Sequence, residues 1–229
     1  MVAPASADVA PSADPAWALA RLDAAYGAQH WWPAESSFEM MAGAILVQNT
    51  AWSGAKQAVD ALKLAGLLSP SAIRTADPAA LGAVIRPAGY FNLKTRRLKS
   101  LCEFLGRYDD DLARLFAQPK EILRAELLGV WGVGKETADS IVCYEAKQPL
   151  FVVDAYTRRL FHRLGWTDAK AGYDTLQDLV HGALPADADL FGQFHALIVH
   201  HAKAHCRSKP ACPGCPLAAR CRLAQGESL

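Results

Sequence analysis

Apolar residues recur at spacings of three and four along most of the chain, and this helical periodicity limits the possible folds more than any other feature of the sequence. Breakers such as Ser69-Pro70, Asp77-Pro78 and Pro87-Ala88-Gly89 divide the periodic stretches. The single run with strand character, Leu150–Val153, is too short and solitary to make a sheet. We therefore predict an all-α protein with some ten helices. The clearest helical stretches are Ala16–Tyr26, Phe38–Leu46, Ala55–Leu64, Leu98–Leu105, Ile122–Leu128, Ala138–Tyr144 and Phe191–Ala202.

The placement of the breakers suggests two helical lobes. We expect a barrel-like helical subdomain with a hairpin at 35–150, and a second lobe from 15–34 and 151–229 that holds the cysteine-rich end. Residues 1–14 are rich in Ala, Pro and Ser and lack the basic start and apolar core of a signal peptide, so we expect a disordered tail. No apolar run reaches the roughly 18 residues of a membrane span. A cytoplasmic protein without a membrane partner is therefore expected.

Net charge gives no indication of a nucleic-acid partner. The chain has 24 Lys and Arg against 23 Asp and Glu, which leaves a formal charge of +1. If DNA is the partner, the basic residues must be gathered on one face of the protein.

A glycine-rich turn between two apolar helical stretches is the most specific backbone feature. Gly132 and Gly134 permit left-handed torsions and close approach, and a second helix begins almost at once with Thr137-Ala138. Exposed amides at such a helix start suit a phosphate oxygen. A plain helix-turn-helix corner with a glycine cap would give the same pattern. On pattern alone, the two interpretations are about even.

Four cysteines form the strongest metal signal, in the pattern Cys206-x5-Cys212-x2-Cys215-x5-Cys221. The loop between them contains prolines and a glycine and has little other means of folding. Tetrahedral zinc and a [4Fe-4S] cluster are equally compatible with the spacing. Cys102 and Cys143 lie in apolar helical patterns and are predicted to be packed thiols.

Asp154 and a group of tryptophans are the other candidates for chemistry. Asp154 stands where the N-cap of a helix at Ala155–Leu164 belongs. Trp31-Trp32-Pro33 and Trp52 flank one apolar helix and could form a stacking slot for an extruded base, in which indole faces would favour a cationic base. Tryptophans are also frequent core residues, and that alternative stays open.

Gly132-Val133-Gly134 and Thr137-Ala138, followed by Val152-Val153-Asp154, resemble the helix-hairpin-helix and Gly/Pro-Asp motif of the endonuclease III superfamily of DNA glycosylases. The resemblance implies that Asp154 is the catalytic carboxylate, which stabilises a sugar with oxocarbenium character. Bifunctional members have a lysine nucleophile at the position of Glu136. Glu136 therefore belongs to the candidate catalytic set, and its presence puts lyase chemistry in doubt. Lys135 points about 100° away on the helix and is expected to face phosphate.

Within that superfamily, the chain is most similar to the bacterial 3-methyladenine DNA glycosylase branch, from about residue 30 to 165. The similarity rests on Trp32-Pro33, Leu46–Thr50, Arg86–Lys94, Gly134–Asp139 and Val152–Tyr156. It implies that Trp32, Pro33 and Trp52 contact the base, and that Gln48 fills the gap left by the flipped nucleotide. The superfamily places an iron–sulfur cluster at an almost identical cysteine pattern, although this branch need not carry one. We therefore expect a [4Fe-4S] cluster, with zinc as the alternative.

These inferences predict a monomeric, monofunctional glycosylase that removes a damaged, alkylated base from duplex DNA in the cytoplasm, in association with the nucleoid. The alternatives are an oxidised-pyrimidine glycosylase and lyase that uses another lysine, and a non-catalytic binder of damaged DNA. The predicted catalytic residues are Asp154 and Glu136, the base pocket Trp31, Trp32, Pro33 and Trp52, the DNA contacts Gln48, Asn49, Gly132, Val133, Gly134, Lys135, Arg207 and Lys209, and the metal ligands Cys206, Cys212, Cys215 and Cys221.

Overall fold

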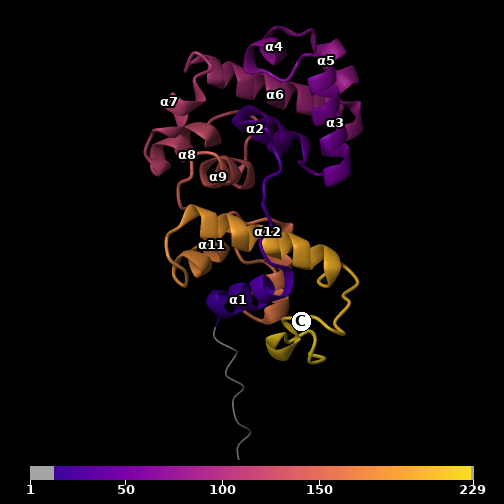
Figure 1. Ribbon diagram of the computed structural model, residues 1–229, viewed down its shortest axis with the longest axis vertical. Helices are drawn as coiled ribbons and strands as arrows, with labels where there is room; N and C mark the ends of the chain where they lie inside the picture. The colour runs from indigo at the N-terminus through magenta and orange to yellow at the C-terminus, as the bar shows by residue number, and fades with distance from the viewer. Residues whose placement is uncertain (1–12, 228–229) are drawn as a thin grey trace, which may run out of the picture. The chain divides into compact units, whose positions relative to one another are not determined.

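The computed structural model describes residues 13–227, and the prediction of an all-helical protein is confirmed. These residues contain twelve α-helices and two short 3-10 helices, and no strand (Figure 1). Most of the tail expected at 1–14 lies outside the described residues. Asp14, its last residue, is the N-cap of α1 (Pro15–Tyr26) and accepts a hydrogen bond from the amide of Trp17.

The described chain forms two compact units. Residues Trp32–Leu150 make one, called here the hairpin unit, and the residues before Trp32 and after Leu150 make the other, called here the cysteine unit. No helix among the described residues combines the length and apolar character that a membrane span requires.

The hairpin unit is built around α2 (Ser37–Leu46), of which every residue after Ser37 is buried. Helices α3, α6 and α9 pack against it. Ser36 caps α2 by accepting a hydrogen bond from the amide of Glu39, and the Glu39 carboxylate accepts one from the amide of Glu35. This reciprocal arrangement satisfies two donors at the helix start. The other elements of the unit are α3 (Trp52–Leu64), α4 (Pro70–Thr75), α5 (Pro78–Val84), η1 (Arg86–Ala88), α6 (Phe91–Gly106), α7 (Leu112–Phe116), α8 (Lys120–Leu128) and α9 (Lys135–Tyr144).

A fully buried lysine joins three elements of the hairpin unit. The ammonium of Lys94 on α6 donates to the carbonyl of Leu46, at the end of α2, and to the carbonyl of Ala88 in η1, each at 2.7 Å. Burial, together with the nearby charge of Arg97, lowers the pKa of Lys94 to about 8. Lys94 therefore satisfies two carbonyls that the ends of short helices leave without an intrahelical partner.

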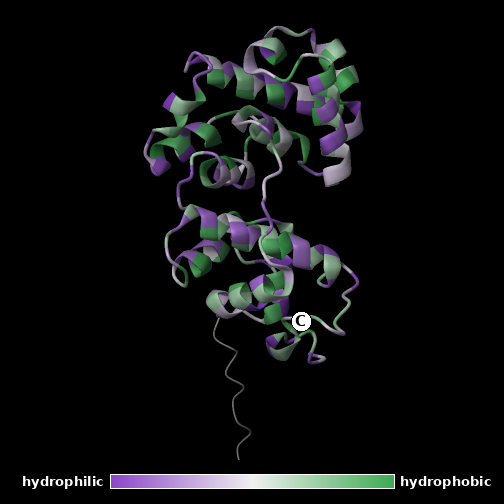
Figure 2. Cartoon of the chain, viewed as in Figure 1, coloured by the Kyte–Doolittle hydropathy of each residue, from purple (hydrophilic) through white to green (hydrophobic). Residues whose placement is uncertain are grey.

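The cysteine unit combines α1 with α10 (Ala155–Leu164), α11 (Tyr173–His181) and α12 (Ala188–Ala204). Helix α12 packs against both α10 and α1. The core of the cysteine unit includes the fully buried rings of Phe151, Phe161 and Phe194. The cysteine loop follows α12 and contains the short helix η2 (Ala218–Arg220). Hydrophobic and hydrophilic residues are mixed along most helices of both units, as expected for helices with one buried face (Figure 2). Helix α2 is the exception, because it is buried on all sides.

Candidate functional site

Asp154 lies at the N-cap of α10, as the sequence pattern predicts. Its Oδ1 accepts hydrogen bonds from the amide and the hydroxyl of Thr157, at 2.7 and 3.0 Å. Its Oδ2 lies 3.6 Å from Nε2 of His195 on α12. The carboxylate is thus held on both sides by groups of the cysteine unit, and only 10% of its side chain is exposed.

The surroundings of Asp154 favour its charged form. Burial by itself raises the pKa of this carboxyl, but the contact with His195 and the two hydrogen bonds from Thr157 lower it. The balance holds the pKa of Asp154 below its ordinary value. A mostly buried, oriented carboxylate that is ionised near neutral pH can stabilise a neighbouring positive charge more strongly than one in water can.

The hairpin connects α8 and α9 and has two glycines, which differ in backbone torsion and in the space that a side chain would find. Gly132 has a φ of +88°, and a Cβ at this position would lie 2.3 Å from Cγ of Arg97. Gly134 is the N-cap of α9 with a φ of −100°, and no atom lies within 4 Å of its would-be Cβ. Val133 between them is buried. The turn thus exposes backbone at Gly134, immediately before the first turn of α9.

Lys135 and Glu136 are the first two residues of α9. Glu136 is exposed. An acidic residue at a helix start interacts favourably with the helix dipole, which accounts for a glutamate in this first turn. The carbonyl of Glu136 accepts a hydrogen bond from the hydroxyl of Ser140.

Gln48 is hydrogen-bonded to the hairpin. Its amide nitrogen donates to the carbonyl of Gly132 and to the hydroxyl of Thr137, and its amide oxygen accepts from Arg97 at 2.5 Å. The next residue, Asn49, is exposed and has a left-handed backbone with a φ of +54°. The structure therefore brings the predicted gap-filling residue together with the predicted backbone-binding turn.

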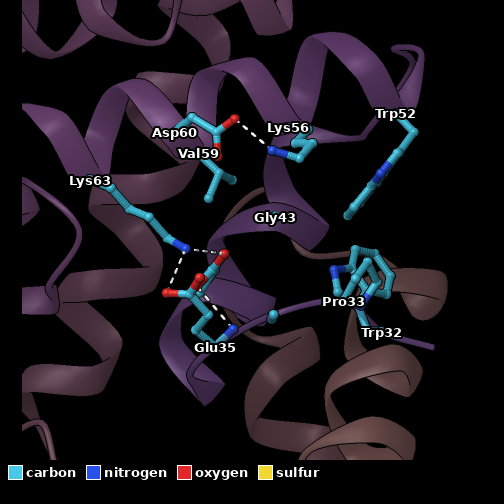
Figure 3. A pocket seen from close by; sticks show the side chains of 11 residues that line it. Trp32, Pro33, Glu35, Gly43, Trp52, Lys56, Val59, Asp60 and Lys63 are labelled. Atoms are coloured by element: carbon cyan, nitrogen blue, oxygen red, sulfur yellow. Dashed lines mark hydrogen bonds and ion pairs between the residues drawn. The ribbon is translucent and has the colours of Figure 1, made fainter. Parts of the chain in front are cut away.

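Trp32 and Trp52 line one pocket in the hairpin unit, of about 360 Å³, together with Pro33 and Gly43 (Figure 3). The two indole rings meet edge to face, with centroids 5.3 Å apart. Paired charges line another part of the wall, together with Ala34 and Val59. Lys63 bridges Glu35 and Glu39, and Lys56 pairs with Asp60 (Figure 3).

Trp31 does not line this pocket. It belongs to the cysteine unit, where it lines a separate cavity of about 380 Å³ with Gln29, His200 and Lys203.

All four C-terminal cysteines line one small cavity. The Arg163 guanidinium donates to the sulfur of Cys206 at 3.3 Å, and Nε2 of His201 lies 3.8 Å from the sulfur of Cys215. Burial raises the pKa of the Cys215 thiol, and the charges of the other three cysteines raise it further. Among the described residues, however, no three His, Cys, Asp or Glu side chains are already arranged to hold a metal ion. Arg207 and Lys209, the predicted phosphate contacts of this loop, are exposed.

The sequence patterns did not identify His195 or Arg97. His195 lies on the buried face of α12 with Phe191, Phe194 and Ile198, so a polar residue at a core position of the helical pattern was the available signal. Arg97 lies on an amphipathic helix where arginine is unremarkable, and nothing in the sequence links it to Gln48.

A family model described as "HhH-GPD superfamily base excision DNA repair protein" matches residues 42–185. A protein of Methanocaldococcus jannaschii with the provisional name of a DNA repair glycosylase is 45% identical over 198 residues, which cover 86% of this chain and 90% of that protein. Endonuclease III of Sulfolobus acidocaldarius is 28% identical over 188 residues, with 81% of each chain covered.

Solved structures of the same fold are also similar. The 3-methyladenine DNA glycosylase MagIII of H. pylori, bound to 1,N6-ethenoadenine, superposes with a TM-score of 0.72 and 26% identity, over 84% of this chain and 98% of that one. A trapped covalent complex of an endonuclease III with DNA superposes with a TM-score of 0.80 and 21% identity, over 92% and 95% of the two chains. At that identity, the second comparison supports the fold alone.

Proposed function

Because the chain belongs to the HhH-GPD superfamily of base excision DNA repair proteins, we propose that this DNA glycosylase hydrolyses the N-glycosidic bond of an alkylated base, without a covalent enzyme–DNA intermediate. The observation that carries the proposal is the placement of Asp154, a mostly buried carboxylate with both oxygens in contact with groups of the same unit and a pKa held below its ordinary value. A monomer acting on duplex DNA is sufficient for this reaction.

Asp154 supplies negative charge where the departing base leaves positive charge on the sugar. A fixed carboxylate stabilises an oxocarbenium-like transition state without reorganising during the reaction. It also accepts a hydrogen bond from the attacking water and orients it. A cationic alkylated base is already a good leaving group, so this chemistry needs no second carboxylate as a general acid.

The residue at position 136 supports a hydrolytic reaction rather than a lyase reaction. Schiff-base chemistry needs an amine that is partly neutral and directed at the sugar. The first turn of α9 has Glu136 at the position where the resemblance to bifunctional glycosylases would require that amine. A carboxylate cannot form a Schiff base.

The pocket of Trp32 and Trp52 is the proposed site of the flipped base. Indole faces attract cations, and a pocket with two of them favours an alkylated, positively charged base over its neutral parent. The similar H. pylori enzyme is a 3-methyladenine DNA glycosylase whose complex contains 1,N6-ethenoadenine, and this supports an alkylated purine as the substrate class.

The hairpin is the proposed grip on the DNA backbone. The exposed amides around Gly134, with the dipole of α9 behind them, suit a phosphate oxygen. Lys135, Arg207 and Lys209 add positive charge for further phosphates, while Gln48 and Asn49 are the proposed residues that fill the gap in the stack.

We also propose that Cys206, Cys212, Cys215 and Cys221 hold a [4Fe-4S] cluster, with zinc as the alternative. The donor set fits either group, because four thiols share one cavity. Burial raises the pKa of the Cys215 and Cys221 thiols, and a bound cation would hold them as thiolates. Arg163 and His201 are placed to contact two of the sulfurs. The group would stabilise the loop and takes no part in the proposed hydrolysis.

A lesion panel with an Asp154→Asn variant tests the proposal. Duplexes with 3-methyladenine, an oxidised pyrimidine or no lesion are incubated with the wild type, and base release is measured together with binding. We expect release of the alkylated base only, and a loss of roughly 10²- to 10³-fold in Asp154→Asn with DNA binding retained. Asparagine is as good an N-cap as aspartate, so the variant should fold.

Asp187→Asn is the matched control, because Asp187 is the N-cap of α12 and accepts a hydrogen bond from the amide of Leu190. It should keep full activity. Release of the oxidised pyrimidine with strand cleavage would favour the bifunctional alternative, and binding without any base release would favour the non-catalytic one.

A further inference from the structure

His195 is a buried polar side chain among apolar residues of α12. It lies on α12 with 5% of its surface exposed, and it shares that face with Phe194 and Ile198. Burying an imidazole costs free energy unless it meets a polar partner. Oδ2 of Asp154, 3.6 Å away, is a partner of opposite charge whenever the ring is protonated.

The two oxygens of Asp154 have separate partners. Oδ1 accepts both hydrogen bonds from Thr157 and thereby caps α10. Oδ2 makes neither of them and faces His195. Because the cap fixes one oxygen, the rotation of the carboxylate plane depends on what holds the other.

We propose that His195 is a positioning residue for Asp154, which fixes the direction of Oδ2 and thereby the alignment of the carboxylate with the reacting sugar and water. This inference rests on the proposed function. At 3.6 Å the contact is longer than a hydrogen bond, and catalytic contacts of this kind commonly tighten only when substrate is bound. The contact also opposes the effect of burial, which alone would favour the neutral acid.

A positioning role predicts a loss of rate rather than of affinity. Misplacing a catalytic group by about 1 Å can cost about a hundredfold in rate, whereas the hairpin that binds the DNA backbone belongs to the other unit. The single-turnover rate of base release should therefore fall, and binding to duplex DNA should not.

Two polar variants of different reach test this. In His195→Gln the amide nitrogen extends about as far as Nε2 of the imidazole, while in His195→Asn it stops short of Oδ2. We expect the single-turnover rate to fall by about 10- to 100-fold in His195→Asn and to stay within about tenfold of wild type in His195→Gln. Affinity for duplex DNA should change by less than about threefold in both. His162→Gln, on α10 but away from Asp154, is the matched control and should retain the wild-type rate.

Equal rates in the Gln and Asn variants, or an unchanged rate in folded His195→Asn, would overturn the proposal. So would a fall in rate that only follows a fall in thermal stability.

A second readout does not depend on glycosylase activity. The titration of the Asp154 carboxyl, followed by carbon NMR, should show a higher pKa in His195→Asn than in the wild type. Of the two groups that lower that pKa, His195 and Thr157, the variant would keep Thr157 alone. If the wild type releases no base and the NMR shift is still present, the proposed function fails and the pairing stands. If the shift is absent, the pairing fails.

Discussion

Glu136 is the residue at which the proposed monofunctional reaction can be changed most directly. Borohydride should trap no covalent complex between the wild type and DNA, because position 136 has no amine. Glu136→Lys should give weak trapping that requires an abasic site and increases with pH, since only the neutral amine attacks. The measurement is a shifted band on a denaturing gel.

Lys135→Gln is the control for the neighbouring amine and should leave the trapping by Glu136→Lys in place. Strong trapping by the wild type would mean that Lys135 or another lysine is a nucleophile, and the hydrolytic mechanism would have to be abandoned.

The two hairpin glycines allow a matched test of the turn. Gly132→Ala puts a Cβ where φ is +88° and where Cγ of Arg97 lies 2.3 Å away, so we expect a loss of roughly 1–3 kcal/mol in stability and weaker DNA binding. Gly134→Ala has an ordinary φ and open space, and should be tolerated in the fold. Thermal unfolding and a binding titration distinguish the two. Equal destabilisation by both substitutions would show that the positive φ at position 132 does not explain why glycine is needed there.

Single residues could be predicted where a local pattern fixes their role. Asp154 was found at its N-cap because capping depends only on neighbours in the sequence. His195 was not found, because its role depends on which side chain α10 presents to α12. Trp31 and Trp32 are adjacent in the sequence but line different cavities, since successive side chains of a non-helical segment point to different sides. Adjacency therefore says little about a shared pocket.

Lys94 connects α2, η1 and α6, and removing it should loosen all three. Lys94→Met fills the space but leaves the carbonyl of Leu46 without a donor, while the carbonyl of Ala88 keeps its hydrogen bond from the hydroxyl of Thr50. We expect this to cost about 1–3 kcal/mol near neutral pH. The pKa of Lys94 is about 8 in the folded protein and about 10.4 for an ordinary lysine, so the unfolded state binds the proton more tightly. The stability of the wild type relative to Lys94→Met should therefore rise as the pH rises from about 8 toward 10.

Urea unfolding of both proteins at pH 7 and about pH 9.5 measures this difference, and groups shared by the two proteins cancel. Lys56→Met, which removes an exposed lysine of α3, is the control and should show little cost and no such trend. A relative stability that falls with rising pH would contradict the assigned pKa direction.

The helices of ten or more residues could be predicted from the sequence, whereas the nine-residue α11 (Tyr173–His181) and the shortest helices were not predicted. Helices α4, α5 and α7 have five to seven residues, too few for a spacing of three and four to repeat. As sequence patterns, Ser69-Pro70 and Asp77-Pro78 indicate breaks between helices. In the structure each is a helix start, with the polar residue as N-cap and proline in the first turn. Recognising this signal would have given α4 and α5 from the sequence.

For the whole molecule, the proposed cluster predicts a loss of stability confined to one unit. A protein with the proposed cluster is brown, with broad absorbance at about 400 nm. Cys212→Ser should lose this colour and should destabilise the cysteine unit. Hydrogen exchange should then quicken in α10 and α12 and remain slow in α2 and α6. Metal analysis accompanies both measurements. Cys102→Ala, in the hairpin unit, is the control and should stay coloured.

Colourless wild-type protein with stoichiometric zinc would replace the iron–sulfur assignment with the zinc alternative. Colourless protein without metal would remove both, and the cysteines would then be reduced thiols that pack the loop.

The cysteine unit is made of residues that come before and after the hairpin unit in the sequence, and this has a consequence for synthesis on the ribosome. The hairpin unit is one continuous stretch and can fold while later residues are still being translated. Helix α1 cannot complete its packing then, because its buried residues Ala18 and Leu22 lie in a unit whose partner helix, α12, is made about 160 residues later. The apolar face of α1 therefore has no packing partner during most of translation. We expect chaperone contact with α1 to end only when α12 emerges from the ribosome.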